Sequence, residues 1–385
     1  MGRFRATLLL IFGFVFFYIA FQLFGYNQFG SWGTWVGFLF VAAVIGIIAS
    51  LPLFFWFRSD RRESKLVVLW SETAYLAMPY LNFLLLSVAL RDISEGLLRL
   101  IGVRAFHYTS LETIVLLVVP VVLTWAGRFS ALRTPRTIRI DITDPRIPKA
   151  FDRYRIVQLS DVHISSSMPE HLLKKIANVA HTLDSDLIVL TGDIIDGAPE
   201  QHRHSLEILK TLRGRDGTLM VPGNHEYYWG IDRIAETARG LGLQLLMNES
   251  HTLTRRSSSL RVAGVVDPTS AVFGGPSPAL EPLRPASPDE FVILLCHQPG
   301  LADQAAAYGY GLQLSGHTHG GQLLPWTLLI GLFHRYPKGL YRIARMWLYV
   351  SQGTGFWGPT NRLGSHCEIT EITLHSSQSS DLPAS

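Results

Sequence analysis

The sequence predicts membrane-spanning helices at the N terminus followed by an α/β domain, and two observations carry this prediction. Residues 6–25 and 32–57 contain no Asp, Glu, Lys or Arg, and each run reaches the ~20 apolar residues needed to cross a bilayer core. From Thr137 onward, short β-rich segments alternate with segments of helical period, which is the pattern of βαβ units. The composition changes near residues 127–136, where we expect the domain boundary.

We expect four spanning helices, at about 6–25, 32–57, 66–90 and 108–126. The first should be retained rather than cleaved as a signal peptide, because a second long span follows a short linker. Within the third span, Glu72 is either a functional ionisable group or an interfacial residue near the helix start. The predicted organisation is therefore an anchor over residues 1–127, a catalytic domain over 128–375 and a disordered tail over 376–385.

The charges of the loops predict the orientation, because cytoplasmic loops preferentially keep Lys and Arg. With four spans, one side of the membrane receives most of the basic residues that flank the helices, namely Arg3, Arg5, Arg58, Arg61, Arg62, Lys65, Arg128, Arg133 and Arg136. We therefore expect a multi-pass protein of the cell inner membrane with a cytosolic catalytic domain. Three spans would place that domain on the opposite side.

Composition and spacing exclude several classes of function. Cys296 and Cys367 have neither framework nor Cys-x-x-Cys spacing, so the sequence predicts no disulfide scaffold and no structural zinc site. The net charge of +4 is not gathered into one stripe, so no nucleic-acid partner is expected. Gly274-Gly275 lacks the Lys that a P-loop requires. Ser160 has no base at triad-like spacing, which argues against a serine nucleophile.

Polar clusters follow the ends of the predicted strands, where α/β sheets place their ligands. The strands are expected at 154–159, 187–190, 218–221, 243–247, 291–296 and 312–314, with helices near 172–183, 205–213 and 231–241. The clusters are Asp161-Val162-His163, Gly192-Asp193, Gly223-Asn224-His225-Glu226, His297 and Gly316-His317-Thr318-His319. Such mixed nitrogen and oxygen ligands suit Mn, Fe or Zn. Seven ligands exceed the needs of one ion, so we expect two divalent ions with Asp193 as the bridging carboxylate.

In order and spacing, these clusters resemble the motif set of the calcineurin-like metallophosphoesterases, over about residues 137–375. The later run Gly353-Thr354-Gly355-Phe356-Trp357-Gly358-Pro359 is similar to the bacterial membrane-associated phosphodiesterase branch. The resemblance implies a four-layer sandwich of two mixed β-sheets flanked by helices. It also implies one metal ion held by Asp161, His163, Asp193 and His319, and a second held by Asp193, Asn224, His297 and His317.

The resemblance further implies a phosphoric ester hydrolase, in which metal-bound hydroxide attacks phosphorus and His225 assists the leaving group. Asp196 and Glu226 would orient the ligands. The implied substrate is a phosphodiester or pyrophosphate, soluble or lipid-linked, and the UDP-2,3-diacylglucosamine pyrophosphohydrolases are one example in the superfamily. The alternative in another class is a membrane sensor that binds a phosphorylated ligand without turnover. The apolar run 323–333, followed by His334, Arg335 and Lys338, either faces lipid or packs in the core.

Overall fold

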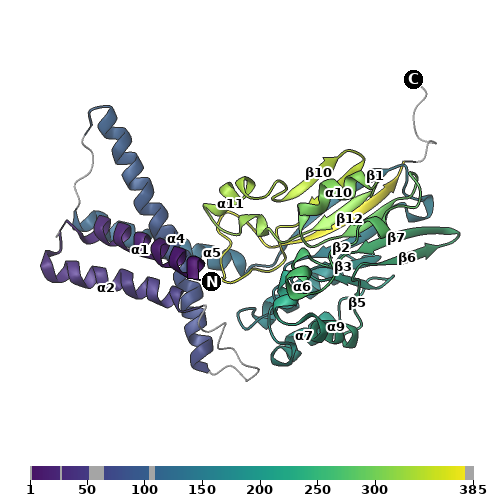
Figure 1. The fold of residues 1–385 in the computed structure, drawn as a ribbon, viewed down its shortest axis with the longest axis horizontal. Coiled ribbons are helices and arrows are strands. Elements are labelled where there is room, and N and C mark those ends of the chain that lie inside the picture. The colour runs from purple at the N-terminus through teal and green to yellow at the C-terminus, as the bar shows by residue number, and fades with distance from the viewer. Residues whose placement is uncertain (1, 27, 52–64, 104–108, 378–385) are drawn as a thin grey trace. The chain divides into compact units, whose positions relative to one another are not determined.

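The computed structural model describes residues 2–26, 28–51, 65–103 and 109–377. Its contacts divide the chain into two units, which we describe separately. The first comprises Met1–Ser130 with Gly358–Leu363, and the second comprises Ala131–Trp357 with Gly364–Ser385. Figure 1 shows that the first unit is helical and that the second contains all of the labelled strands. The second unit corresponds to the predicted catalytic domain, and we therefore call it the catalytic unit.

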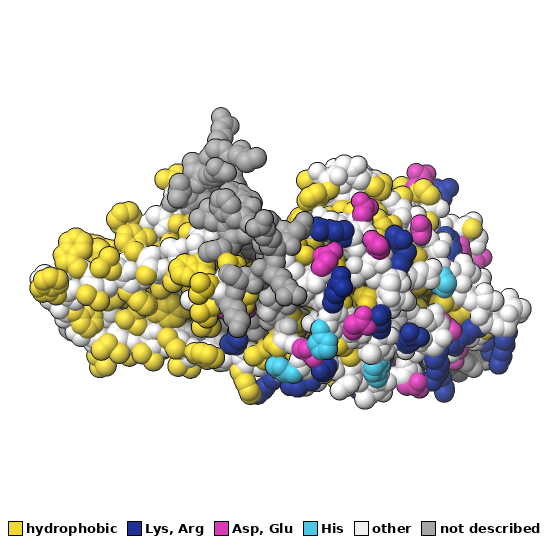
Figure 2. All heavy atoms as spheres, turned by 90° about the horizontal axis from the view of Figure 1, so that it is seen from below, with side chains coloured by type: hydrophobic (Ala, Val, Ile, Leu, Met, Phe, Trp, Pro, Cys, Tyr) yellow, Lys and Arg dark blue, Asp and Glu magenta, His cyan; other side chains and the backbone are white. Residues whose placement is uncertain are grey.

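The helical unit contains α1 (Gly2–Phe24), α2 (Gly30–Ala49), α4 (Lys65–Leu100) and α5 (Ser110–Ala131). Among the described residues, three helices are long and apolar enough to cross a membrane, at Gly30–Ala49, Leu66–Leu100 and Ser110–Ala131, and a shorter apolar helix covers Leu10–Phe24. The predicted spans 32–57 and 108–126 extend into positions outside the described residues. Yellow apolar side chains dominate the surface of this unit in Figure 2. The number of spans stays a prediction.

A small polar cluster joins three of these helices. The guanidinium of Arg91 in α4 is buried and donates to Asp92, to Glu112 in α5 and to Gln22 in α1. Because a charge in an apolar unit is costly unless it is paired, these contacts satisfy the guanidinium within the unit. Glu72 lies near the start of α4 and is half-buried.

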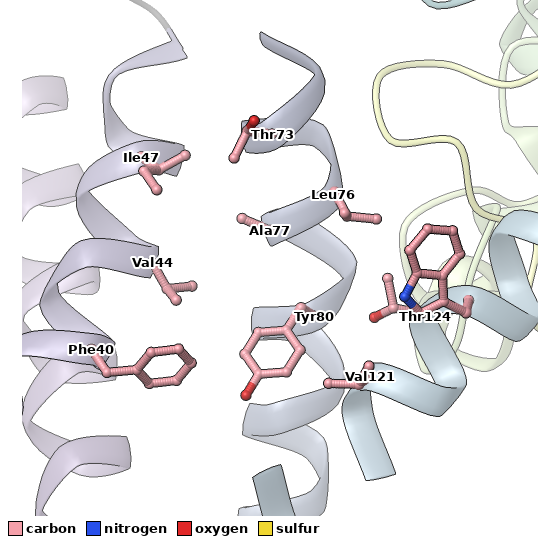
Figure 3. Close-up of a pocket in the computed structure, with 10 residues that line it drawn as sticks. Phe40, Val44, Ile47, Thr73, Leu76, Ala77, Tyr80, Val121 and Thr124 are labelled. Atoms are coloured by element: carbon pink, nitrogen blue, oxygen red, sulfur yellow. The ribbon is translucent and has the colours of Figure 1, made fainter. Parts of the chain in front are cut away.

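An apolar groove of about 360 Å³ lies between α2, α4 and α5. In Figure 3, Phe40 and Val44 of α2 face the ring of Tyr80 in α4, and the Phe40 and Tyr80 rings meet edge to face at 6.2 Å. Val121 and Thr124 of α5 line the other side. Among the described residues, no charged side chain lines the groove, so its surface is compatible with the hydrocarbon core of a membrane, as is the apolar composition of these helices.

The catalytic unit is built on two mixed six-stranded sheets. The order in the first sheet is β1 (Arg136–Asp144), β12 (Glu368–Ser376), β2 (Tyr154–Leu159), β3 (Leu187–Thr191), β4 (Thr218–Val221) and β5 (Gln244–Leu245). The order in the second sheet is β10 (Gly339–Ile343), β11 (Met346–Val350), β9 (Leu312–Ser315), β8 (Val292–Leu295), β7 (Ser258–Gly264) and β6 (Glu249–Arg255). Strands β2 to β5 are parallel, as are β7, β8, β9 and β11.

The two sheets share one apolar layer, which contains Ile156 and Val189 from the first sheet and Ile293 and Leu312 from the second. Fully burying such a side chain stabilises the fold by about 1.5–3 kcal/mol. Helices α6 (Glu170–Thr182), α7 (Arg203–Leu209) and α9 (Ile231–Gly240) contribute to the apolar layer on the other face of the first sheet. Helix α10 (Ala302–Ala307) packs on the outer side of the second. This arrangement confirms the predicted four-layer sandwich.

All six predicted strands are present, although β5 is shorter than the predicted 243–247. Six further strands, β1, β6, β7, β10, β11 and β12, have no predicted counterpart. All six lie at or next to a sheet edge, and β1, β6 and β10 alternate exposed with less exposed residues instead of forming continuous apolar runs. Strand β12 still includes Ser376, so the predicted tail begins inside a strand. Residues 378–385 lie outside the described residues.

Candidate metal centre

The predicted ligands lie on loops that leave parallel strands at the same edge. Asp161 and His163 follow β2, Asp193 follows β3, and Asn224 follows β4 in the first sheet. His297 follows β8, while His317 and His319 follow β9 in the second sheet. Because the carboxyl ends of parallel strands meet at one edge of a sheet, and the two sheets are stacked, the loops converge.

Five of the seven predicted ligands have a left-handed backbone. Asp161, His163, Asp193, His317 and His319 have φ values between 50° and 73°. A side chain in this region costs roughly 1–2 kcal/mol per residue, although Asp and His occupy it more readily than most residues. Such strain persists only where the surrounding structure imposes it, and it is concentrated at functional sites.

The ligand side chains form two overlapping groups. In the first, the Nε2 atoms of His163 and His319 lie 3.1 Å apart, and Nε2 of His319 lies 3.5 Å from Oδ1 of Asp161. In the second, Nε2 of His297 lies 3.2 Å from Oδ2 of Asp193. The second group also includes His317, which brings its Nδ1 within 3.0 Å of Asn224 Oδ1.

The Asp193 carboxylate lies between these groups. Its Oδ2 atom is 3.9 Å from Nε2 of His163 and 3.2 Å from Nε2 of His297. In the residues that the structure describes, two sets of possible ligand atoms that lie within 4.8 Å of one another include Asp193, one with His163 and His225 and the other with His297 and His317. A single carboxylate shared by two donor groups is the geometry that a pair of ions requires.

The two ring nitrogens of His297 show whether a cation would fit between this side chain and Asp193. Nδ1 of His297 contacts the carbonyl oxygen of Thr191 at 2.8 Å and must donate to it, which leaves Nε2 as the atom available to a ligand. Nε2 is buried and makes no hydrogen bond within the described part of the chain. Burial would lower the pKa of His297, but the Asp193 carboxylate raises it well above its ordinary value. A proton or a metal ion is therefore required between these two side chains.

His225 sits beside the two groups with one nitrogen already engaged. Its Nδ1 lies 2.8 Å from Oδ1 of Asp196, and its Nε2 lies 3.9 Å from Oδ2 of Asp193. Oδ1 of Asp196 also accepts from the indole nitrogen of Trp229 at 2.8 Å. Burial would lower the pKa of His225, but the hydrogen bond and charge of Asp196 raise it to about 9. The position of His225 leaves Nε2 as the atom that can meet a substrate.

Glu226 holds the loop that carries Asp193. Its fully buried carboxylate accepts four backbone N–H groups: those of Ile194 and Ile195 at Oε1, and those of Asp193 and Gly223 at Oε2. The distances lie between 2.7 and 3.0 Å. Glu226 therefore acts on the centre by positioning backbone rather than by direct contact with a ligand.

Two glycines permit the close approach of these loops. A Cβ at Gly316 would lie 2.0 Å from Oγ of Ser160 and 2.1 Å from Oδ2 of Asp161, and a Cβ at Gly223 would lie 2.2 Å from Oδ1 of Asp193. Any larger residue would displace a ligand. Oγ of Ser160 donates to Asp161 at 2.6 Å, so this hydroxyl orients a carboxylate.

Burial controls the protonation of other groups in the centre. It raises the pKa of the Asp161 carboxyl, while burial and the nearby charge of His297 lower the pKa of His317 to about 3. Imidazole binds metal in its neutral form, and this low pKa favours the neutral form of His317. Burial would raise the pKa of Asp196, but hydrogen bonds with His163 and His225 hold it well below its ordinary value.

The known proteins that this chain resembles belong to one family. The family model of calcineurin-like phosphoesterases matches residues 154–321. An uncharacterized metallophosphoesterase of Campylobacter jejuni is 31% identical over 346 residues, which cover 88% of this chain and 89% of that protein. Proteins named "Transmembrane protein with metallophosphoesterase domain" match from Danio rerio, at 30% identity over 68% of this chain and 62% of theirs, and from Bos taurus, at 33% over 66% and 61%.

Proposed function

The chain belongs to the calcineurin-like metallophosphoesterase family, and we propose that its catalytic unit hydrolyses a phosphodiester or pyrophosphate bond with two divalent ions, Mn, Fe or Zn. The shared position of Asp193 between two donor groups carries this proposal. The relatives with transmembrane names and the three apolar helices support an enzyme held in a membrane.

In this proposal each ion takes four ligands. One ion is held by Asp161, His163, Asp193 and His319, and the other by Asp193, Asn224, His297 and His317. When bound, the pair supplies Lewis acidity toward the phosphoryl group and a water of lowered pKa. The left-handed loops and the glycines beside them fix these side chains before substrate arrives, which avoids reorganisation during the reaction.

His225 is the proposed general acid. Asp196 engages its Nδ1, so the proton that can reach a leaving oxygen is the one on Nε2. The indole of Trp229 donates to the same oxygen of Asp196 and limits rotation of that carboxylate. A proton donor held in this way contributes typically 10²–10⁴-fold to rate. The same complete arrangement argues against a sensor that binds its ligand without turnover.

A hydrolysis screen tests this function. The full chain, purified in detergent and supplied with Mn²⁺, would be incubated with a soluble aryl phosphodiester, nucleotide-sugar lipids and phospholipids, beside Asp193→Ala as the matched inactive control. We expect release of product from at least one substrate class by the wild type alone. Full metal occupancy without turnover of any of these substrates would favour the sensor.

We further propose that the catalytic unit faces the cytosol of an inner-membrane, multi-pass protein, because the basic loops gather on one side when four spans are counted. Reporter fusions after Lys65 and after Arg136 should both report cytosol, and a fusion after Ile101 should report the opposite side. A periplasmic signal after Arg136 would mean three spans and would exclude a cytosolic substrate.

A further inference from the structure

Exposed apolar side chains are confined to a few segments of the catalytic unit. Within residues 131–377, every exposed large apolar side chain belongs to α8 (Asn224–Tyr228), η3 (Pro268–Phe273), the segment 326–333, Leu340 or Trp357. The described parts of α6, α7, α9 and the paired strands β6 and β7 expose none. A contiguous exposed apolar patch on an otherwise polar protein marks an interaction surface.

Except for Leu340, these segments lie beside residues of the predicted metal centre. Helix α8 carries His225, and the Tyr228 ring lies 5.2 Å from the ring of His225 and 6.1 Å from that of Phe273. The Trp357 ring lies 5.8 Å from His225 on another side. The segment 326–333 leads directly into His334, whose ring lies 5.9 Å from that of His317. We call this set of exposed apolar side chains the apolar rim.

The segment 326–333 is two-sided. It consists of α11 (Trp326–Leu329), η7 (Ile330–Leu332) and Phe333. Thr327 is buried, and the backbone of Trp326 lies against Gly321, two residues from His319. Leu328, Leu332 and Phe333 point the other way and are 76%, 77% and 70% exposed. The alternative that this run belongs to the core is therefore wrong for these three side chains.

We propose that the apolar rim inserts into the surface of the bilayer that the chain's own helices cross, and that it admits the phosphoester headgroup of a membrane lipid to the metal centre. This inference rests on the proposed hydrolase function for the nature of the substrate, but not for the insertion of the rim. The substrate class is then an amphiphile whose hydrocarbon contacts the rim while its phosphorus lies at the ions.

The bilayer is favoured as the occupant because the chain's own apolar helices tie the catalytic unit to it. Helix α5, which is apolar enough to cross a membrane, ends at Ala131, and β1 begins at Arg136, so only a few residues separate the two. Aliphatic and aromatic side chains backed by cations suit an anionic interface. His334, Arg335 and Lys338 follow the segment, and the side chain of Arg335 is 74% exposed and forms an ion pair with Asp303 at 2.8 Å.

Insertion can be measured without any enzymatic assay. The native Cys296 and Cys367 are buried, so a maleimide dye would label an introduced exposed cysteine selectively. We would reconstitute the full chain into vesicles containing anionic phospholipid with brominated acyl chains, labelled at Leu332→Cys or, as control, at Thr252→Cys. Thr252 is exposed on β6, which lies at the opposite end of the catalytic unit from α11 in Figure 1.

The expected result is at least threefold stronger quenching by brominated lipid at position 332 than at position 252. Equal and weak quenching at the two positions would overturn insertion of the rim, whether or not the protein hydrolyses phosphoesters.

Substrate class needs a second comparison. The variant Leu328→Ser/Leu332→Ser/Phe333→Ser would be matched by Leu328→Met/Leu332→Met/Phe333→Leu, which keeps the surface apolar. For each we would divide turnover of a phospholipid in vesicles by turnover of a soluble aryl phosphodiester. This ratio should fall at least tenfold in the serine variant and stay within about twofold in the apolar variant.

An unchanged ratio in the serine variant would refute a lipid substrate while leaving hydrolase function intact. If the wild type turned over neither of these substrates nor the nucleotide-sugar lipids of the screen, the proposed function would fail, and the quenching experiment would still decide the insertion.

Discussion

Replacing Glu226 with Gln tests how far the metal centre depends on one buried carboxylate. Each carboxylate oxygen accepts two backbone N–H groups, and all four donors are buried. A glutamine amide keeps the shape, but in either orientation its NH₂ group faces two N–H donors that it cannot accept. Burial and the charge of Asp193 raise the pKa of Glu226, yet four donors favour its charged form.

The magnitude follows from the number of donors left without an acceptor. A buried donor without a partner costs about 1–3 kcal/mol, so two cost roughly 2–6 kcal/mol, with a central value near 4 kcal/mol. For a unit of this size, 1 kcal/mol shifts Tm by about 2–4 °C, which gives a fall of roughly 8–16 °C. The affinity for Mn²⁺ should also weaken by about 10–100-fold, because the loop of Asp193 loses its support.

Thermal melts of the full chain in detergent, with and without Mn²⁺, would measure both effects. Glu290→Gln is the matched control, because Glu290 is partly exposed and pairs with Arg261 far from the ligands. Its loss should cost no more than about 1 kcal/mol. The reasoning would be refuted if Glu226→Gln melted within 2 °C of the control and bound Mn²⁺ as tightly.

Outcomes are also expected for three other single substitutions. His225→Ala should keep its metal but lose 10²–10⁴-fold in turnover, whereas Asp193→Ala should lose both metal and turnover. Metal content would be measured beside the rate for each variant. An empty metal site in His225→Ala would contradict the role assigned to His225. Asp144→Asn should lower the free energy of unfolding by about 3–5 kcal/mol, because it removes the only charge paired with the buried Arg146 within the described residues and leaves the carbonyl oxygens of Gly309 and Arg345 as its neutral acceptors. Burial opposes the ionised form of Asp144, but Arg146 holds its pKa below the ordinary value, so wild-type stability should fall as the pH drops below about 4. A melting series from pH 7 to pH 3 should show a smaller acid loss in Asp144→Asn than in the wild type.

The strands could be predicted where the apolar character of the sequence agrees with a central position in the sheet. Strands β2, β3, β4, β8 and β9 lie inside sheets, so they are almost wholly buried and mainly apolar, and each ends at a polar cluster. Strands such as β6 and β10 expose alternate residues, and their β-propensity is diluted by polar side chains. Their pairing depends on partners elsewhere in the chain, which a local pattern does not contain.

The positions of the ligands could be predicted because residue type and strand end coincide, but the supports behind them could not. The sequence around Trp229 resembles the start of an ordinary helix. The Trp229 indole donates to Asp196 only because the fold brings the two residues together. The Gly before Asn224 was visible as part of a motif, but its distance from Asp193 depends on the packing of two loops. Positive φ at His317 likewise leaves no mark on the residue itself.

The apolar segment 326–333 shows the limit most clearly, because hydropathy records what a side chain is and not what it contacts. Thr327 and Leu328 are neighbours, yet the polar one is buried and the apolar one is exposed. An apolar run of this composition is expected whether the segment packs in the core or faces lipid. The two alternatives differ only in which side chains pack against the catalytic unit. Gly321 admits the backbone of Trp326 at a distance that no Cβ would allow, and Leu328 and Leu332 face outward from this contact. Gly321 lies two residues after the predicted ligand His319, so one short motif both carries a ligand and positions the apolar segment 326–333 at the edge of the site.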